Sequence, residues 1–248
     1  MHRVFIDPTL ATSDVIDLSE RESHHLARVL RVREGEIVEG LDGCGHRVLA
    51  KVDTITKNSV TLRVQKFQKC EAMVPKISLF QAIPKGKNME WIVEKATELG
   101  IYQIIPILSE RTEVRPDKEA RGRKVKKWVA TAIDSIKQCG SPWLPLITEP
   151  LDISSALAIS SGIDLSMVAT FAKDARHPRL LMDEFARIQG KRPQAMAVWI
   201  GPEGDFTDPE LTLIRRSGVH PITLGSLVLR AETAAIYSLS VLRYESQI

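Results

Sequence analysis

The chain has 248 residues, of which 44% are hydrophobic and 26% charged, and its formal net charge is +3. This composition is typical of a globular protein with one large or two ordinary domains, and it excludes a disordered or fibrous chain. The longest apolar runs are only of strand length, so we expect no membrane-spanning helix, and the start of the chain lacks the apolar stretch of a signal peptide. Three widely spaced cysteines fit neither a disulfide framework nor a zinc site, so we expect no metal and a cytoplasmic location.

The first part of the chain, residues 1–72, is predicted to consist mostly of strands. Runs of β-branched residues predict strands at Glu36–Asp42, Val48–Ile55 and Ser59–Phe67. One amphipathic helix, Glu20–Arg31, interrupts this pattern, with Ser19 as its N-cap. We therefore expect a small β-barrel, a module that is common in nucleic-acid-binding proteins and in many others.

Beyond residue 75 the predicted strands and helices alternate. This order predicts an α/β domain over residues 75–248, with a largely parallel sheet covered by helices on both faces. The predicted strands are Ile77–Ile83, Tyr102–Leu108, Met167–Phe171, Ala195–Ile200 and Val219–Leu224. The predicted helices are Lys87–Leu99, Lys118–Gln138, Pro178–Ile188, Asp208–Ser217 and Ala231–Tyr244. Asp208-Pro209 is interpreted as the N-cap of its helix followed by a first-turn proline.

Basic residues are concentrated in two places. Between Arg111 and Lys127 the chain has eight Lys and Arg against three Asp and Glu, a stripe that fits RNA phosphates or a solvated helix face. On the N-terminal helix, His24-His25 is followed by several arginines. Adjacent helical residues point about 100° apart and lack a third ligand nearby, so a phosphate-contacting or solvated face is favoured over a metal site.

Two glycine-containing stretches near the C-terminus predict a ligand pocket. Residues 198–206 read VWIGPEGDF and residues 222–234 read ITLGSLVLRAETA, so each apolar run leads into a glycine loop and then a helix. A plain strand-to-helix connection would explain either loop alone. Because open α/β sheets bind ligands beyond the carboxyl ends of their strands, the pair predicts one shared pocket.

The motifs that the sequence lacks reduce the range of possible ligands. It contains no P-loop, no dinucleotide-binding glycine motif, no nucleophile elbow and no zinc-protease motif. Backbone amides and carbonyls exposed in glycine loops suit an adenine edge and ribose hydroxyls. S-adenosylmethionine, a nucleoside cofactor without phosphates, is therefore the ligand that we expect.

The order of these motifs resembles that of the RsmE family, SPOUT-class enzymes that methylate the N3 nitrogen of a uridine in 16S ribosomal RNA. The strongest matches are Ile200–Gly204, Leu224-Gly225 and Leu229–Ala234. Shorter matches cover almost all of the remaining chain: His24–Arg31, Asp42-Gly43, Gln81–Gly86, Glu94–Gly100, Ser109–Thr112 and Gln138–Pro145. Their joint order is specific, whereas no single motif is.

The resemblance implies a fold and partners. It implies a SPOUT-like α/β domain with a deep trefoil knot, preceded by a PUA-like β-barrel that binds RNA. It also implies a homodimer that acts on 16S rRNA, either free or within the small ribosomal subunit. Two alternatives stay open: a SPOUT methyltransferase acting on another RNA such as tRNA, and a non-catalytic RNA-binding homologue.

The resemblance also assigns residues to the site. Those expected to bind the cofactor lie in and around the glycine loops: Thr170, Phe171, Ile200, Gly201, Pro202, Glu203, Gly204, Leu224, Gly225, Ser226, Leu227, Leu229, Thr233 and Ala234. Those expected to bind RNA are basic: Arg3, His24, His25, Arg28, Arg31, Lys85, Arg111, Arg121, Lys124 and Lys127.

The proposed chemistry requires loss of a proton from the uracil, because a protonated N3 is a poor nucleophile. Arg230 is expected to stabilise the uracil anion, and Glu203 or Glu232 is expected to act as a base or to orient the uracil. A carboxylate in the first turn of a helix is also favoured by the helix dipole, which is a structural explanation for Glu232.

The chain departs from the family pattern in three places. Asp205 stands where a glycine is usual, and Ser226-Leu227 stand where a basic residue is usual. Cys139-Gly140-Ser141 replace a serine and an arginine. These changes affect the expected RNA contacts and leave the cofactor loops intact.

Overall fold

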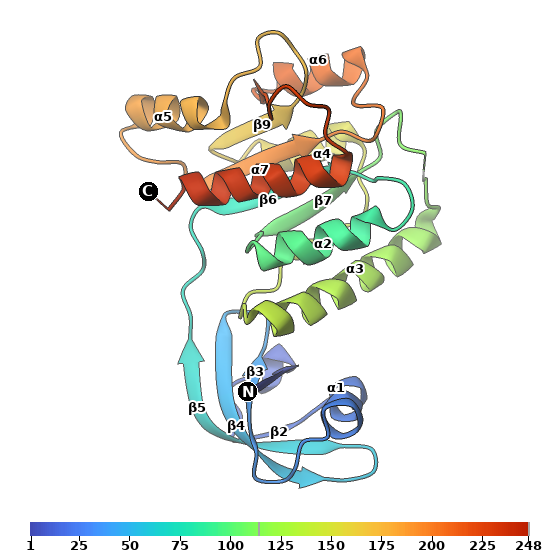
Figure 1. Cartoon of the computed structure of the whole chain (residues 1–248), viewed down its shortest axis with the longest axis vertical. Helices are drawn as coiled ribbons and strands as arrows, with labels where there is room; N and C mark the ends of the chain where they lie inside the picture. The colour runs from blue at the N-terminus through green and yellow to red at the C-terminus, as the bar shows by residue number, and fades with distance from the viewer. Residues whose placement is uncertain (114, 248) are drawn as a thin grey trace. The chain divides into compact units, whose positions relative to one another are not determined.

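The computed structural model describes residues 1–113 and 115–247 (Figure 1). The chain forms two compact units, one made of Met1–Ala72 with Ala132–Leu144 and the other of Met73–Thr131 with Pro145–Ile248. The division falls inside a single long helix, α3 (Lys118–Cys139), which contributes its last turns to the first unit. Each unit is therefore built from two separate stretches of the chain.

The first unit contains a five-stranded sheet in the order β1-β3-β4-β5-β2. Its strands are β1 (His2–Phe5), β2 (Val15–Asp17), β3 (Ile37–Leu41), β4 (His46–Ile55) and β5 (Val60–Lys69). The antiparallel strands β3, β4 and β5 confirm the three predicted strands. The sequence pattern does not reveal β1 and β2, because strands of three or four residues are too short to show alternation.

The predicted N-terminal helix consists of two parts. It begins as α1 (Glu20–His24), whose N-cap Ser19 accepts a hydrogen bond from the Glu22 backbone N–H at 3.4 Å. It continues as a π-helix, η2 (His25–Leu30), and a short 3₁₀ helix, η1 (Pro8–Leu10), precedes it. Leu26 anchors the helix in a core that it shares with inward-facing strand residues.

The second unit contains a six-stranded parallel sheet in the order β11-β9-β10-β6-β7-β8, which confirms the predicted α/β class. Its strands are β6 (Lys76–Ala82), β7 (Gln103–Ile107), β8 (Leu146–Ile147), β9 (Leu165–Ala169), β10 (Ala195–Ile200) and β11 (His220–Ile222). Its helices besides α3 are α2 (Asn88–Glu98), α4 (Ile153–Ser160), α5 (Pro178–Gln189), α6 (Asp208–Arg216) and α7 (Ala231–Glu245). Strand β8 and helix α4 are absent from the sequence-based prediction.

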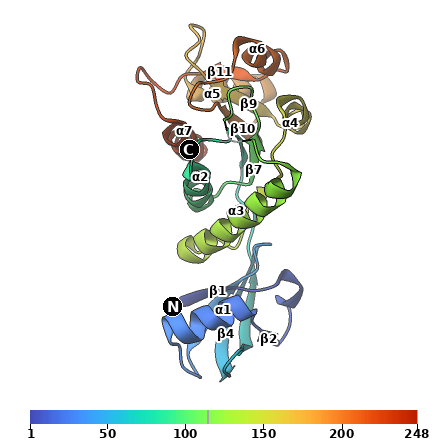
Figure 2. The ribbon, with the colours of Figure 1, turned by 90° about the vertical axis from the view of Figure 1, so that its right-hand side faces the viewer.

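Helices cover both faces of this sheet, with α2 and α7 on one side and α4 on the other (Figure 2). On the α4 side, Phe80 and Trp199 stack with ring centroids 4.3 Å apart. The N-cap of α6 is Thr207, not Asp208 as predicted, because Thr207 forms a capping box with Glu210. No helix in the described part of the chain is long and apolar enough to cross a membrane.

Candidate active site

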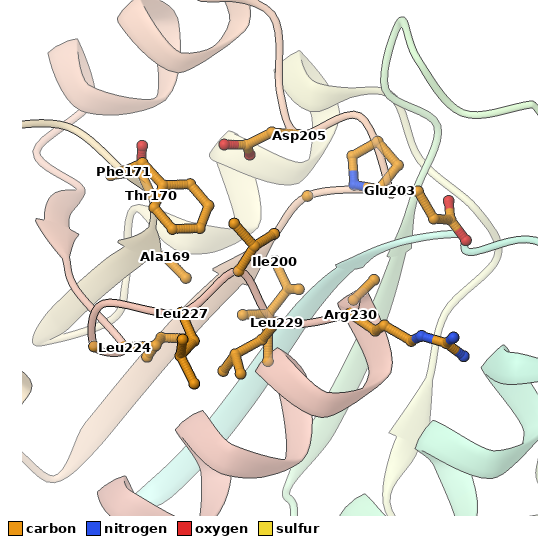
Figure 3. A pocket seen from close by; sticks show the side chains of 16 residues that line it. Ala169, Thr170, Phe171, Ile200, Glu203, Asp205, Leu224, Leu227, Leu229 and Arg230 are labelled. Carbon is orange, nitrogen blue, oxygen red and sulfur yellow. The ribbon is translucent and has the colours of Figure 1, made fainter.

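A pocket of about 260 Å³ lies at the carboxyl ends of β9 and β10 (Figure 3). The loops after β10 and β11 and the first turn of α7 complete its walls. Its lining is mostly apolar and comprises Ala169, Thr170, Phe171, Ile200, Gly201, Pro202, Glu203, Asp205, Leu224, Gly225, Leu227, Val228, Leu229, Arg230, Ala231 and Ala234. The two glycine loops therefore share one pocket, as the sequence predicts.

The structure brings most of the predicted cofactor residues into this pocket. The exceptions are Gly204, Ser226 and Thr233, which do not line it. Ala169, Asp205, Val228 and Ala231 line it and were not predicted. Each of these four is a chain neighbour of a predicted residue or lies in the same loop, so only loop geometry could have selected them.

Two of the lining glycines are required by their surroundings. A Cβ at Gly201 would lie 2.7 Å from Asp205 Oδ1 and 3.1 Å from the backbone nitrogen of Phe206. At Gly225 the backbone φ is +111°, a conformation that residues with a side chain rarely adopt. Any larger residue would therefore distort the loop at either position.

The second loop leaves backbone donors free. Among the residues that the structure describes, no partner is present for the N–H groups of Leu227, Val228 and Leu229. All three residues line the pocket. Free N–H groups beside apolar side chains can hold the edge and face of a flat heterocycle.

Three charged residues line the pocket, and they point in different directions. Glu203 and Arg230 extend toward one side, whereas the Asp205 carboxylate points toward the side of Phe171 (Figure 3). Glu203 Oε1 accepts a hydrogen bond from the Lys85 backbone N–H at 2.8 Å, which ties the loop after β10 to the loop after β6. Arg230 is the N-cap of α7, and its guanidinium has no partner among the described residues.

Asp205 has an unusual environment. Its backbone φ is +59°, in the left-handed region, and its Oδ1 accepts the Phe206 backbone N–H at 2.7 Å. Burial raises the pKa of the Asp205 carboxyl above its ordinary value, and the Phe206 hydrogen bond and the Arg111 cation partly oppose this. The third acid considered from the sequence, Glu232, lies in the first turn of α7 and does not line the pocket.

The segment after β7 packs against the first glycine loop. The Arg111 guanidinium donates a hydrogen bond to the Gly204 carbonyl oxygen, and the Glu110 carboxylate accepts one from Thr207 Oγ1 at 3.1 Å. The Glu110 backbone N–H donates to Glu210 Oε1 at 2.6 Å. Arg111, which we expected to bind RNA, thus contacts the backbone of the loop that carries Glu203.

The remaining predicted RNA-binding residues of the second unit differ in whether their side chains already have a partner within the protein. Lys85 Nζ pairs with Glu113 at 2.7 Å, and Lys127 Nζ pairs with Glu90 at 2.7 Å. The side chain of Arg121 donates to the Pro116 carbonyl oxygen at 3.2 Å. Lys124 has no partner among the described residues. It is therefore the predicted contact in this stripe whose charge is wholly available.

In the first unit, Arg3 is engaged by the protein itself. Its guanidinium pairs with Glu39 at 2.8 Å and donates to the carbonyl oxygens of Lys137 at 3.1 Å and Gln138 at 2.9 Å. These contacts satisfy the C-terminal end of α3, and the guanidinium packs directly on Gly140. An Arg3 used in this way holds the unit together.

The other predicted residues of the first unit are available to a ligand. His24 and Arg28 line a second, smaller pocket of about 80 Å³, together with the turn 56–59 between β4 and β5. Across the described residues, His25 and Arg31 have no side-chain partner. No group of His, Cys, Asp and Glu side chains in the described part of the chain could hold a metal ion.

Comparison with protein families decides the assignment of the chain. Residues 70–243, well over half of the chain, match the model described as RNA methyltransferase domain, and residues 18–65 match that described as RNA methyltransferase PUA domain. The chain belongs to the RNA methyltransferase family. The second match confirms the PUA-like assignment of the N-terminal sheet.

Individual members of this RNA methyltransferase family are similar over the whole chain. Ribosomal RNA small subunit methyltransferase E from Bacillus subtilis is 25% identical, with 100% of this chain and 98% of the relative covered. A protein from Legionella pneumophila, described as a methyltransferase and solved with bound S-adenosylmethionine, is 31% identical with a TM-score of 0.88, covering 98% and 96% of the two chains. The small subunit methyltransferase E from Neisseria gonorrhoeae shares the fold at 23% identity, with a TM-score of 0.85 and coverage of 98% and 97%. The resemblance to the RsmE family is confirmed.

Proposed function

We propose that the protein transfers the methyl group of S-adenosylmethionine to the N3 nitrogen of a uridine in 16S rRNA, in the cytoplasm. The observation that carries this proposal is the apolar pocket, where the backbone N–H groups of Leu227–Leu229 and the Arg230 guanidinium have no partner among the described residues. The full-length similarity to enzymes named for the small ribosomal subunit supports the choice of substrate.

The pocket fits this cofactor better than it fits a nucleotide. Its lining holds two carboxylates and one guanidinium, a balance that disfavours phosphate groups and tolerates a cationic ligand. Leu227–Leu229 would hold the adenine, since their N–H groups match its acceptor nitrogens and their side chains its faces. When bound, S-adenosylmethionine supplies an electrophilic methyl group on a sulfonium.

The protein's own groups prepare the nucleophile. Arg230 lines the pocket and has no partner in the part of the chain that the structure describes, so its charge is available to stabilise the negative charge that develops on the uracil oxygens as N3 loses its proton. Glu203 already accepts the Lys85 N–H through Oε1, and its second oxygen is available to accept the N3 proton or to orient the uracil. We propose no role in the reaction for Glu232, because it does not line the pocket. Its place in the first turn of α7, where the helix dipole favours a carboxylate, is enough to explain it.

The unpaired basic residues are the proposed RNA contacts. His24, Arg28 and Arg31 in the first unit and Lys124 in the second have no partner among the described side chains. Such groups can neutralise phosphates without first breaking an internal ion pair. We retain Lys85 and Lys127 as weaker candidates, because each already pairs with a glutamate.

From the resemblance to SPOUT enzymes we also propose that the connection through the glycine loops is knotted.

We further propose that the protein is a homodimer. Helices α2 and α7 pack together and expose large aromatic side chains, among them Trp91, Tyr237 and Tyr244. Exposed aromatic residues on one helical layer are typical of a covered interface. Analytical ultracentrifugation of the purified protein should give twice the mass of the chain, and a monomer at micromolar concentration would remove this proposal.

Two experiments test the main proposal. Calorimetry should detect binding of S-adenosylmethionine, and no binding at millimolar cofactor would overturn the enzyme assignment. In a deletion strain, 16S rRNA should lack one N3-methyluridine, which mass spectrometry detects. The modification should return when the wild-type chain is restored. If 16S rRNA were unchanged and a tRNA lost a methyl group instead, the proposed substrate would be wrong.

A further inference from the structure

The Asp205 carboxylate in the cofactor pocket has one oxygen to spare. Oδ1 accepts the Phe206 N–H at 2.7 Å, and within the described residues the side chain makes no other hydrogen bond. The residue is half-buried and lines the pocket. A partly buried carboxylate with a free acceptor oxygen is a binding group for a donor that the protein itself does not supply.

Among the described residues, the hydrogen bond from the Phe206 N–H is the one bond that this side chain contributes to the fold. A left-handed φ of +59° suits glycine, which is the usual residue here in the family that the chain resembles, and costs less for Asp and Asn than for other residues with a side chain. Burial also works against the charged carboxylate, as its raised pKa shows. Backbone strain and a desolvated charge that coincide in a pocket indicate a functional constraint.

The position of Asp205 in the pocket indicates which part of the ligand its carboxylate would contact. Its carboxylate points toward Phe171, which is 64% exposed, and away from Glu203 and Arg230 (Figure 3). An exposed aromatic ring at the rim of an apolar pocket suits one face of an adenine. In the proposed reaction, charge develops on the uracil at the side with Arg230. The Asp205 side is therefore the nucleoside side.

We propose that Asp205 binds the ribose of the cofactor by accepting hydrogen bonds from its hydroxyl groups. This inference rests on the proposed function and names one residue of the same site. The ribose diol offers two O–H donors, and hydrogen bonds from hydroxyls to an ionised carboxylate are short and strong. The assignment makes Asp205 a cofactor-specificity residue that distinguishes ribose from deoxyribose.

A binding cycle separates this contact from a general effect on the loop. Calorimetry would compare S-adenosylhomocysteine with its 2′,3′-dideoxy analogue in the wild type and in Asp205→Gly, a change that also removes the backbone strain. In the wild type we expect the analogue to bind about tenfold more weakly or worse. In Asp205→Gly we expect the natural ligand to bind about as weakly as the analogue, and the two ligands to differ less than twofold.

Controls fix what each result means. Asp205→Asn keeps the shape and tolerates the left-handed backbone, so it should weaken the natural ligand and bind the analogue as the wild type does. Asp208→Asn, an exposed acid on α6 that does not line the pocket, should change neither affinity. Equal weakening of both ligands by Asp205→Gly would overturn the proposal. Weaker S-adenosylmethionine binding with unchanged S-adenosylhomocysteine binding would overturn it too, in favour of attraction to the sulfonium. A wild type that binds neither would instead refute the proposed function.

Discussion

Arg230 shows how a residue predicted from its place in a motif acquires a specific environment. The sequence places it directly after the second glycine loop, and the structure makes it the N-cap of α7, with a guanidinium at the pocket that no other described residue pairs with. Arg230→Ala should lower single-turnover methylation of 16S rRNA about 100-fold, because one preorganised cationic donor is lost. Calorimetry should show cofactor affinity within about threefold of the wild type. Glu232→Gln is the matched control, and near-wild-type methylation by Arg230→Ala would contradict the assignment.

Asp205 yields a prediction about stability and pH. Burial raises its pKa in the folded state, so ionisation of the carboxyl opposes folding. The charged carboxylate therefore lowers the free energy of unfolding at pH values above the folded pKa. This destabilisation disappears as the pH falls through that value. Asp205→Asn should have a higher melting temperature than the wild type at pH 7, and the difference should shrink as the pH approaches 4. A difference that stays constant or grows toward pH 4 would contradict the buried-charge explanation.

Arg243 controls how the last helix meets the rest of the second unit. Buried in α7, it donates to the carbonyl oxygens of Leu99 at 3.3 Å, Pro75 at 3.2 Å and Gly100 at 2.7 Å. These bonds satisfy the end of α2 and the start of β6. Arg243→Met should lower the free energy of unfolding by about 3 kcal/mol, because three carbonyl groups lose their donor. Urea unfolding measures this change, with the exposed Arg187→Met on α5 as control, expected within about 0.5 kcal/mol.

Helix α3 allows the basic stripe to be tested one charge at a time. Lys124 is unpaired among the described side chains, whereas Lys127 pairs with Glu90 at 2.7 Å. Lys124→Glu should weaken 16S rRNA binding several-fold and reduce the slope of log affinity against log salt by about one. Cofactor affinity should not change. Filter binding at several salt concentrations provides the measurement, with Lys191→Glu, before β10, as control. An unchanged slope would make the stripe a solvated helix face.

The elements that the sequence revealed are those with a full repeat of their pattern. Strand β10 is predicted to the residue, since six consecutive apolar residues end at a glycine. Helix α4 was missed because its eight residues include three serines and no charge, so no polar face stands out. The π-helical turns of His25–Leu30 also have no sequence signature, because their hydrogen bonds depend on tertiary packing.

The same limit applies to the site. The glycine loops can be read from the chain, since glycine is required there for local reasons, and Arg230 is found by its place directly after the second loop. The sequence marked Asp205 only as a departure, because its orientation depends on a left-handed backbone within a folded loop. The sequence also could not predict that Arg3 and Arg111 donate hydrogen bonds to backbone carbonyl oxygens, because those partners lie over 90 residues away in the chain.

At the scale of the whole molecule, the first unit depends on a segment that is distant in sequence. Residues 132–144 belong to it, and Lys137 from this segment pairs with the buried Glu22 at 2.8 Å. The Gly45 backbone N–H donates to the Pro142 carbonyl oxygen at 2.9 Å, which attaches the same segment to the β3–β4 hairpin. Periodicity shows that 132–139 is helical and cannot show which unit covers it.

This arrangement predicts how the N-terminal sequence behaves alone. A fragment of residues 1–72 loses both the cation that pairs with Glu22 and the helix turns that pack on this unit, and a unit this small has little stability to spare. We expect that fragment to be unfolded by amide NMR dispersion, and a fragment carrying residues 132–144 on a Gly/Ser linker to fold cooperatively. In the linked fragment, Lys137→Met should lower the urea midpoint sharply, whereas the exposed Lys57→Met should not. A cooperatively unfolding 1–72 fragment would show that residues 132–144 are dispensable to this unit.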